Sequence, residues 1–395
     1  MSRKLIDHSP DLKKLADQGY NVSIKGGYLV IGDVPYVDAD RNVQRGALVS
    51  QLVIDGQKAV KPRDHVVYFS GAHPCRSDGT QIAGLGRSDA RQHLAEGLDV
   101  EHQFSARPTD SDGFVNFYDK MTNYVNLICP HARKIDPAAT PKTFRPARPD
   151  DDEQTVFKYI DTASSRANIV AISQKLNKGR IAIVGLGGTG SYVLDLLAKT
   201  HAPEIHLFDG DHLLAHNAFR SPGAVPLERL IQRPTKVAYF AELYAAMRDG
   251  IVPHEFVITT ENVNELDSMD FVFLCMEGDA KRAIIEHLEA REKPFIDVGM
   301  GLYSTDDAIG GTLRVTTSTA SQREHVHEKR RIPLGDRRPG QEYEQNIQIA
   351  DLNALNASLA VIKWKKLYGF YGDVKKEFHS TYTVDGNLLL SEDRA

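Results

Sequence analysis

The sequence predicts a mostly parallel α/β sheet, preceded by a smaller β-rich α+β domain. Two observations predict the sheet. An apolar strand at residues 181–184 runs directly into a glycine-rich turn and a helix, and a second apolar strand at 206–208 ends in carboxylates. A third observation concerns the first 135 residues, where short apolar runs alternate with Gly, Asp and Asn. The length of 395 residues fits two or three domains.

The N-terminal domain, residues 1–135, is predicted to begin with a helix over residues 11–17. Strands are then expected over residues 21–24, 28–31, 46–54 and 65–69. A second helix is expected over residues 117–128 because its apolar residues share one helical face. These residues are Phe117, Met121, Tyr124, Val125 and Ile128. The proline-rich, acidic segment 136–154 is the predicted linker.

The C-terminal domain, residues 155–395, is predicted to continue the α/β pattern. A buried central strand is expected over residues 271–275, followed by strands at 293–302 and 310–315. Later elements are a long helix over 346–364 and a β-pair within 378–390. Between them, the polar run 316–341 contains basic residues, and we interpret it as a mobile loop that either meets an acidic partner or is simply solvated. These basic residues are Arg323, Lys329, Arg330, Arg331, Arg337 and Arg338.

The composition is that of an ordinary globular enzyme, with 41% hydrophobic and 26% charged residues. A net charge of −5 argues against nucleic acid as the main partner. No apolar run is long enough to span a bilayer, and the N-terminus has no signal-peptide pattern. Three cysteines form no disulfide framework, so a cytoplasmic location without membrane contact is expected.

The glycine-rich turn has the pattern Gly185-x-Gly187-Gly188-x-Gly190. Glycines permit positive φ angles and let backbone N–H groups approach a phosphate closely. The helix that follows directs its positive N-terminal end toward the same phosphate. The alternative is that the glycines only tighten the packing of strand against helix.

Polar residues after the second strand favour the phosphate interpretation. Asp209 and Asp211 stand where a doubly wound sheet places the acid that faces a nucleotide ribose. Asn217, Arg220 and Lys236 follow, and a nicotinamide-binding fold has no use for this set. Arginine and lysine are the usual donors to phosphate oxygens. The pattern therefore predicts a triphosphate site rather than a dehydrogenase.

These residues resemble the ThiF/MoeB/E1-like (ubiquitin-activating-enzyme-like) adenylyltransferase family over roughly residues 156–386. The family pattern GxGGxGS is complete with Ser191, and Asp209 and Asp211 match its DxD. Asn217 and Arg220 match the Asn and Arg of its SNLNRQ motif, Lys236 matches its phosphate lysine, and Ser221 replaces its glutamine. The N-terminal segment is similar to an uncharacterised domain that precedes some bacterial E1-like proteins.

The resemblance implies a Rossmann-like sheet of the E1/ThiF adenylation type, with ATP and Mg²⁺ as cofactors. It also implies a ubiquitin-like or sulfur-carrier protein substrate, a homodimer, and a loop within 316–341 that crosses the substrate tail. An E2-like protein is a further partner that it suggests. Arg166, which precedes the glycine turn, is the candidate for an arginine that reaches the partner subunit's ATP. An ordinary surface arginine is the alternative.

The family holds Mg²⁺ with an aspartate at the end of the central strand. This chain has Glu277 at that position and Asp279 two residues later. Both carboxylates suit a hard cation. Glu277 is favoured because Arg282 keeps the family's distance from it, and two solvated acids are the alternative.

The cysteines depart from the family pattern. The chain has no CxxC pair, so no zinc is expected, and no cysteine follows Cys275 to form the usual E1 thioester. Cys275 is predicted to be a small buried side chain, and Cys129 is predicted to be structural. Cys75 lies beside His73 and Arg76 and is expected to be accessible, and a thiol in these surroundings could have a lowered pKa and accept an acyl group. A loop cysteine without a role is the alternative.

The sequence therefore predicts adenylation of the C-terminal carboxylate of a ubiquitin-like protein in a bacterial conjugation pathway. The glycine-turn amides and Lys236 would contact phosphates, Asp209 the ribose, and Asn217 and Arg220 the triphosphate. Two other functions remain open at this point. One is a non-catalytic E1-like scaffold that binds nucleotide and a ubiquitin-like partner, and the other is a dinucleotide-dependent oxidoreductase.

Overall fold

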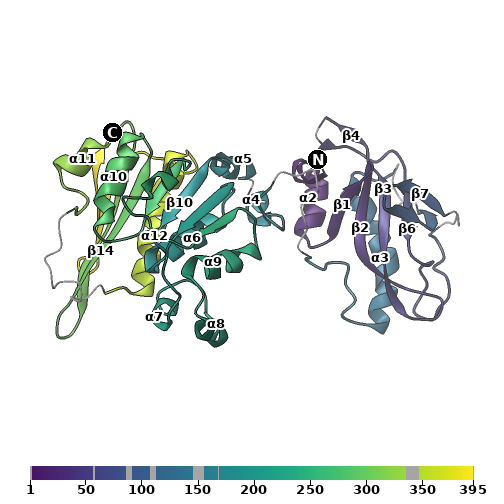
Figure 1. Ribbon diagram of the computed structural model, residues 1–395. Helices are drawn as coiled ribbons and strands as arrows, with labels where there is room; N and C mark the ends of the chain where they lie inside the picture. Colours follow the sequence, from purple (N-terminus) through teal and green to yellow (C-terminus); the bar gives the residue numbers. More distant parts are fainter. Residues whose placement is uncertain are drawn as a thin grey trace. The chain divides into compact units, whose positions relative to one another are not determined.

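The computed structural model describes residues 2–56, 58–85, 91–106, 113–145, 155–167, 169–334 and 347–394. The chain divides into two compact units, which are described separately (Figure 1). The first unit contains Met1–Gln154 and Tyr159–Arg166, and the second contains Thr155–Lys158 and Ala167–Ala395. No helix in the described ranges is both long enough and apolar enough to cross a membrane.

The N-terminal unit is built on a five-stranded antiparallel sheet in the order β1-β2-β3-β6-β9. Its strands are β1 (Asn21–Lys25), β2 (Tyr28–Val37), β3 (Val43–Gln51), β6 (Val66–Ser70) and β9 (His102–Ser105). Two small antiparallel pairs accompany it: β4 (Ile54–Asp55) with β5 (Lys58–Ala59), and β7 (Gln92–Ala95) with β8 (Leu98–Val100). The predicted β-rich α+β domain is confirmed.

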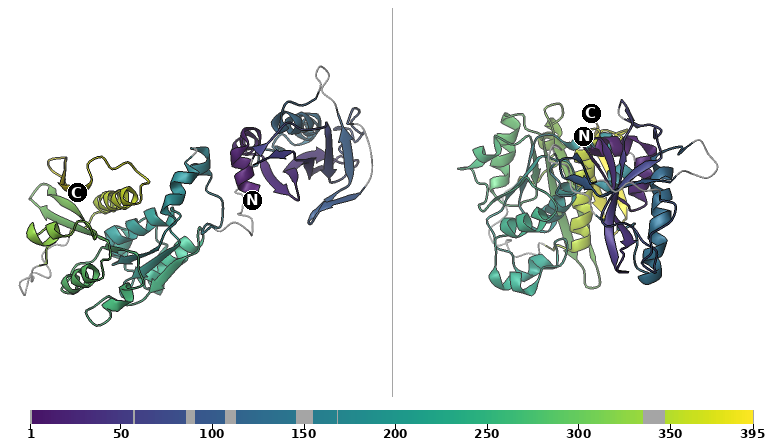
Figure 2. Two further views of the ribbon diagram at one scale, coloured as in Figure 1. Left: turned by 90° about the horizontal axis from the view of Figure 1, so that it is seen from above. Right: turned by 90° about the vertical axis from the view of Figure 1, so that its right-hand side faces the viewer.

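Helices α1 (Ser2–His8), α2 (Pro10–Asp17) and α3 (Phe117–Ile135) cover one face of this sheet (Figure 2). The apolar face predicted for α3 is buried against the sheet. The predicted end at Ile128 is wrong, because the helix continues through Pro130 to Ile135. Proline removes one backbone hydrogen bond, but the packing of Ala132 against Val37 holds the next turn in place.

The C-terminal unit contains an eight-stranded sheet in the order β12-β11-β10-β13-β14-β15-β16-β17. The first five of these strands are parallel, and the last three are antiparallel, so the sheet is mostly parallel as predicted. The strands are β10 (Arg180–Val184), β11 (Glu204–Phe208), β12 (Ile251–His254), β13 (Phe271–Leu274), β14 (Phe295–Ser304), β15 (Ile309–Ser318), β16 (Glu377–Thr383) and β17 (Leu388–Arg394).

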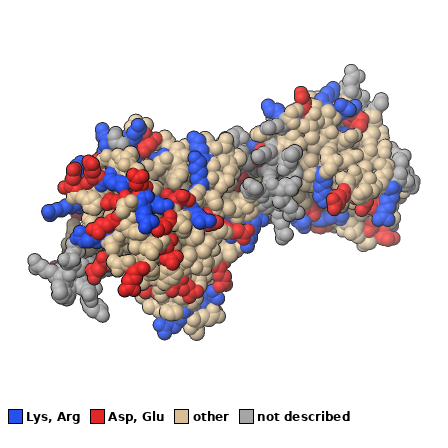
Figure 3. Space-filling view, turned by 45° about the horizontal axis from the view of Figure 1, so that its top comes forward, with Lys and Arg blue, Asp and Glu red and all other residues tan. Residues whose placement is uncertain are grey.

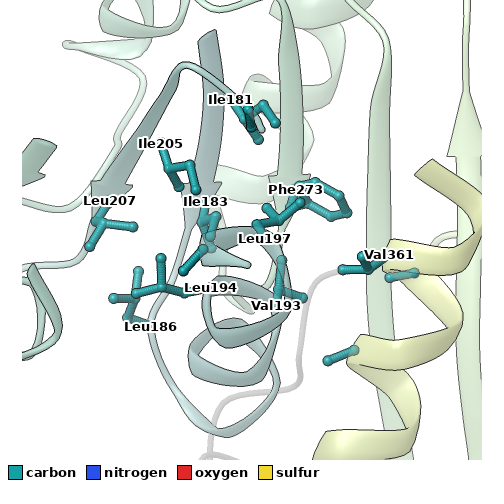
Figure 4. Packing of buried hydrophobic residues seen from close by; sticks show 14 of the residues in the cluster. Ile181, Ile183, Leu186, Val193, Leu194, Leu197, Ile205, Leu207, Phe273 and Val361 are labelled. Atoms are coloured by element: carbon teal, nitrogen blue, oxygen red, sulfur yellow. The ribbon is translucent and has the colours of Figure 1, made fainter. Parts of the chain in front are cut away.

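Helices pack on both faces of this sheet, because successive residues of a strand point to opposite sides. Ile181 and Ile183 of β10 face α6 (Gly188–Ala198), α9 (Lys236–Ala245) and α12 (Ala350–Leu367) (Figure 4). Ala182 and Val184 face the other layer. That layer contains α10 (Ala280–Ala290), α11 (Glu324–Glu328) and the short 3-10 helix η2 (Val263–Leu266).

The remaining helices are short. They are α4 (Thr162–Arg166), α5 (Val170–Ser173), the 3-10 helix η1 (Gln174–Leu176), α7 (Ala215–Ala218) and α8 (Leu227–Gln232). Of these, α4 belongs to the first unit, whereas the others belong to the second. The predicted long helix begins at Ala350 within the described residues, and its expected first residue, Asn346, lies outside them. On the face shown in Figure 3, acidic and basic side chains are interspersed over this unit.

Candidate active site

The glycine turn joins β10 to α6 at the carboxyl end of the parallel strands. Gly185 has a φ of +92° and donates its N–H to the Phe208 carbonyl at the end of β11 (2.8 Å). A Cβ on Gly190 would lie 1.9 Å from the Gly185 oxygen, and one on Gly188 would lie 2.2 Å from Asn353 of α12. The positive φ of Gly185 and the backbone contact at Gly190 therefore require glycine, and a side chain at position 188 would displace Asn353.

Gly187 differs from the other glycines of the turn. A Cβ at this position would meet nothing within 4 Å, and the φ of −72° is open to any residue. Neither packing nor a positive φ requires a glycine here, and the open space leaves the backbone accessible to a group outside the turn. The Ser191 hydroxyl, by contrast, is buried and donates to the Gly188 carbonyl (2.8 Å) within the first turn of α6.

Asp209 connects the glycine turn to the second strand. It is 7% exposed, and its two carboxylate oxygens accept the N–H groups of Leu186 (2.7 Å) and Asp211 (2.9 Å). The sequence did not predict that Asp209 holds the turn in place through these hydrogen bonds. Each carboxylate oxygen can accept more than one hydrogen bond, so Asp209 retains capacity for a ribose hydroxyl.

Lys236 begins α9 and is 6% exposed. Its Nζ lies 2.6 Å from a carboxylate oxygen of Asp211 and 3.3 Å from one of Asp209. The structure thus brings together the predicted ribose acid and the predicted phosphate lysine. The lysine is held in a defined position by two carboxylates next to the glycine turn.

Asn217 and Arg220 lie in and just after α7. The Asn217 side chain accepts the Leu214 N–H (2.9 Å), so it holds the turn that carries Arg220. The Nε of Arg220 is buried without a hydrogen-bond partner, and burial lowers the pKa of this guanidinium. The hydroxyl of the adjoining Ser221 is also buried and unpartnered. Unsatisfied buried donors are costly, and an anion would satisfy them.

His216 is a neighbour of this site that sequence reasoning missed. Burial lowers its pKa first, and the positive charges of Arg220 and Lys236 lower it further. Both cations therefore act electrostatically on the imidazole, although His216 itself is exposed. No spacing in the sequence marks His216, because its importance comes only from the folding of the α7 turn beside α9.

Glu277 and Asp279 follow β13 and are both exposed. Glu277 lines a small cavity at the glycine turn and also an adjoining cavity of about 420 Å³, whereas Asp279 lines only the larger one. The described residues contain no group of three or more His, Cys, Asp or Glu side chains that could hold a metal. Magnesium at nucleotide sites is held by one or two carboxylates together with phosphate oxygens, and Glu277 fits that arrangement.

Two other features were predicted from the sequence: the role of Arg166 and the basic loop within residues 316–341. Arg166 ends α4, but its side chain lies outside the described residues. In the basic run, part of the predicted loop forms α11, and Arg337 and Arg338 lie outside the described residues. Arg331 binds Asp393 through Nε (2.7 Å), and Lys329 contacts the same carboxylate. These two cations therefore already have an acidic partner within the chain.

The expectation that Cys75 is an accessible, acidic thiol is wrong. Cys75 is 2% exposed, and its N–H donates to the Val37 carbonyl (2.7 Å), which fastens this segment to the end of β2. Burial and the nearby carboxylates of Asp38 and Asp78 raise the pKa of the thiol. Cys129 is buried as predicted, with its pKa raised to about 12 by burial. Burial also raises the pKa of Cys275.

Comparisons with known proteins are consistent with this geometry. Residues 161–350 match the ThiF family, and residues 10–162 match a domain of unknown function, DUF6791. None of the curated proteins matches the chain.

Several solved structures are similar. E. coli MccB with MccA-N7isoASN has a TM-score of 0.47 and 15% identity, covering 58% of this chain and 68% of that one. E. coli MccB with ATP has a TM-score of 0.45 and 15% identity, covering 62% and 73%. PaaA has a TM-score of 0.42 and 16% identity, covering 56% and 75%. The chain thus carries a DUF6791 domain over residues 10–162, followed along the sequence by a ThiF family domain over residues 161–350.

Proposed function

We propose that the protein adenylates the C-terminal carboxylate of a ubiquitin-like or sulfur-carrier-like protein at the expense of ATP. The ThiF family match supports adenylation chemistry in general. The observation that carries the proposal is the gathering of phosphate-binding groups at one edge of the sheet. There Gly187 faces open space, Lys236 is held beside the turn by Asp209 and Asp211, and the Nε of Arg220 is buried without a hydrogen-bond partner.

In the proposed reaction, a carboxylate oxygen of the protein substrate attacks the α-phosphorus of ATP. The bond from that phosphorus to the bridging oxygen breaks, and pyrophosphate leaves with the electron pair, so the products are an acyl-adenylate and pyrophosphate. The amides of the glycine turn, Lys236 and Arg220 stabilise the negative charge on the phosphates. Asp209 binds the ribose and also fixes the turn. Positioning and charge neutralisation supply the catalysis.

Magnesium fits the proposal through Glu277, which lines the cavity at the glycine turn. When bound, the ion would neutralise charge on the phosphates as a Lewis acid. Asp279 is the weaker candidate because it lines only the larger cavity. Arg166 reaching the nucleotide of a second subunit, the homodimer that this implies, and an E2-like partner remain further parts of the proposal. Segment 136–154 remains the proposed linker.

The test is ATP–pyrophosphate exchange by the full chain, with ubiquitin-like proteins ending in glycine as substrates. We expect exchange that depends on such a protein, and at least a hundredfold loss in Arg220→Met. Arg229→Met is the matched control, because Arg229 lies in α8 and binds Glu242 instead of the site. It should keep its exchange rate.

The same measurement separates the alternative of a non-catalytic scaffold. The glutamate at 277 and the burial of Cys75 motivate that alternative. If the protein is a scaffold, calorimetry will show that it binds ATP, but it will catalyse no ATP–pyrophosphate exchange with any ubiquitin-like protein. That result would reject the proposed activity.

A further inference from the structure

A second charged cluster lies beside the nucleotide site and includes none of the residues discussed above as ligands. Asp297 of β14 is fully buried, and its two oxygens lie 2.5 Å from Lys281 Nζ and 2.7 Å from Arg314 Nη2. The contacts are close ion pairs, although neither oxygen has the geometry of a directed hydrogen bond. Two cations therefore share one carboxylate, which leaves one excess positive charge away from water.

Two neighbouring residues, Gly299 and Thr316, define the position of the Arg314 guanidinium. A Cβ on Gly299 would lie 2.4 Å from Arg314 Nη2, so only glycine at this position lets the guanidinium lie over the strand. Arg314 Nη1 also donates to the Thr316 hydroxyl (3.0 Å). The arginine is thus held from two sides, and its orientation is fixed before any ligand binds.

Lys281 occupies a position that its own helix does not favour. It is 7% exposed and lies in the first turn of α10, where the helix dipole opposes a positive charge. A buried lysine here needs a compensating anion, and Asp297 supplies one for two cations. The placement is therefore costly for stability and calls for a reason in ligand binding.

Lys281 and Arg314 both line the cavity of about 420 Å³, which has the size of a small-ligand site. This cavity shares Glu277, Gly299 and Met300 with the small cavity at the glycine turn. The two cations thus lie in a space that adjoins the proposed position of the phosphates. A Cβ on Gly301, another lining residue, would meet nothing within 4 Å, so the cavity wall is open there.

We propose that Lys281 and Arg314, held by Asp297, bind the terminal carboxylate of the protein substrate and position it for attack. This inference rests on the proposed function. Two cations around one buried carboxylate can accept one further carboxylate, whereas a triphosphate carries several negative charges and has its own cations in Lys236 and Arg220. The cluster also offsets the repulsion between the carboxylate and the phosphates. Lys281 and Arg314 are positioning residues.

The first experiment measures binding by the full chain without ATP. The probe is N-acetyl-glycyl-glycine, compared with its C-terminal amide by NMR titration. We expect the acid to bind at least tenfold more tightly than the amide, and Lys281→Met to lose this difference. Lys363→Met is the matched control: Lys363 is also buried (5% exposed) and paired with an aspartate, Asp373, at 3.1 Å, but lines a different cavity. It should bind the acid normally.

Equal binding of acid and amide by the wild-type chain, or undiminished binding of the acid by Lys281→Met, would overturn the inference. Lys281→Arg keeps the charge and should restore most of the preference for the acid. This variant distinguishes lost recognition from lost folding.

A second experiment uses ATP–pyrophosphate exchange with the ubiquitin-like substrate. Lys281→Met should raise the KM for that protein at least tenfold and leave the KM for ATP unchanged. A raised KM for ATP alone would assign the cluster to a phosphate and contradict the inference. If the wild-type chain shows no exchange but still prefers the acid, the proposed function fails while the carboxylate site stands.

Discussion

Two buried lysine–aspartate clusters flank the glycine turn, and they have opposite charge. The Asp209 cluster joins Lys236, in the first turn of α9, to Asp209 and Asp211. The Asp297 cluster joins Lys281 and Arg314 to a single carboxylate. One cation with two carboxylates carries an excess negative charge, and two cations with one carboxylate carry an excess positive charge.

The difference shows that similar pairs can prepare a site for different ligands. In the Asp209 cluster, the Asp211 side chain is 71% exposed, so water can rearrange around the pair when a nucleotide binds. The unpartnered Arg220 supplies the additional cation for phosphates. In the Asp297 cluster, the aspartate is fully enclosed and cannot leave its cations. The two cations are therefore held in place, and the ligand that we propose for them is a carboxylate.

The largest expected effect is on the free energy of unfolding when one aspartate of each cluster is replaced by asparagine. Asp297→Asn leaves two buried cations without their counter-ion, and should lower the free energy of unfolding by about 3–5 kcal/mol. Asp211→Asn removes an exposed carboxylate and should cost less than about 1 kcal/mol. Urea unfolding of both variants measures the difference. Equal losses would show that the Asp297 cluster is more hydrated than its burial indicates.

The positive charge near the Asp297 cluster should also appear in the pH dependence of stability. Burial, followed by the positive charges of Arg331 and Arg314, lowers the pKa of His379 to about 4. His379 is therefore protonated at a lower pH in the folded chain than in the unfolded chain. The free energy of unfolding consequently falls as the pH drops from about 6.5 to about 4. His379→Gln should reduce this fall by about 2–3 kcal/mol in urea unfolding at each pH. An unchanged slope would contradict the burial of a neutral histidine.

The glycines of the two cavities allow a smaller, more local test. Gly187→Ala adds a methyl group where the protein has open space, so unfolding should be unchanged. ATP affinity should fall at least about tenfold, measured by calorimetry, because the methyl group separates phosphate from the amides. Gly301→Ala faces the other cavity and should leave ATP affinity as in the wild type. A similar loss in both variants would mean that the cavities are not distinct.

The smallest effect concerns His216 in the nucleotide site. Its pKa is lowered by burial and then by Arg220 and Lys236, and a bound polyanion would raise it again. ATP binding should therefore be coupled to protonation of His216, and ATP affinity should rise as the pH is lowered from about 7.5 to about 5.5. We expect this rise to be about two- to threefold larger in the wild type than in His216→Ala. Calorimetric titrations at the two pH values measure this difference. Parallel pH profiles would place the nucleotide away from His216.

The proximity of the candidate site residues was largely predictable from the sequence, because the parts of the site are short-range and ordered along the chain. A strand, a glycine turn and a helix are recognisable within 181–198. Since parallel strands end at the same edge of a sheet, Asp209 and the residues after it are expected there. What the sequence did not reveal is that Asp209 fastens the turn and that packing already accounts for most of its glycines.

The Cys75 segment shows a different limit. His73, Pro74 and Arg76 indicate an exposed loop, and a cysteine beside cations indicates an acidic thiol. The loop instead bridges back to β2, and the enclosed thiol has a raised pKa. Burial of a loop depends on what packs over it, and composition does not contain that information.

The sequence by itself determined the two domain types, the mostly parallel sheet and the position of the glycine turn, because periodicity and local motifs encode them. Only the tertiary structure determined the Asp297 cluster. Its members come from α10, β14 and β15, and Asp297 stands within an apolar strand without any motif. The antiparallel register that pairs Gly299 with Arg314 brings the charges together. Long-range pairing decides where a charge is buried, and burial decides what that charge can bind.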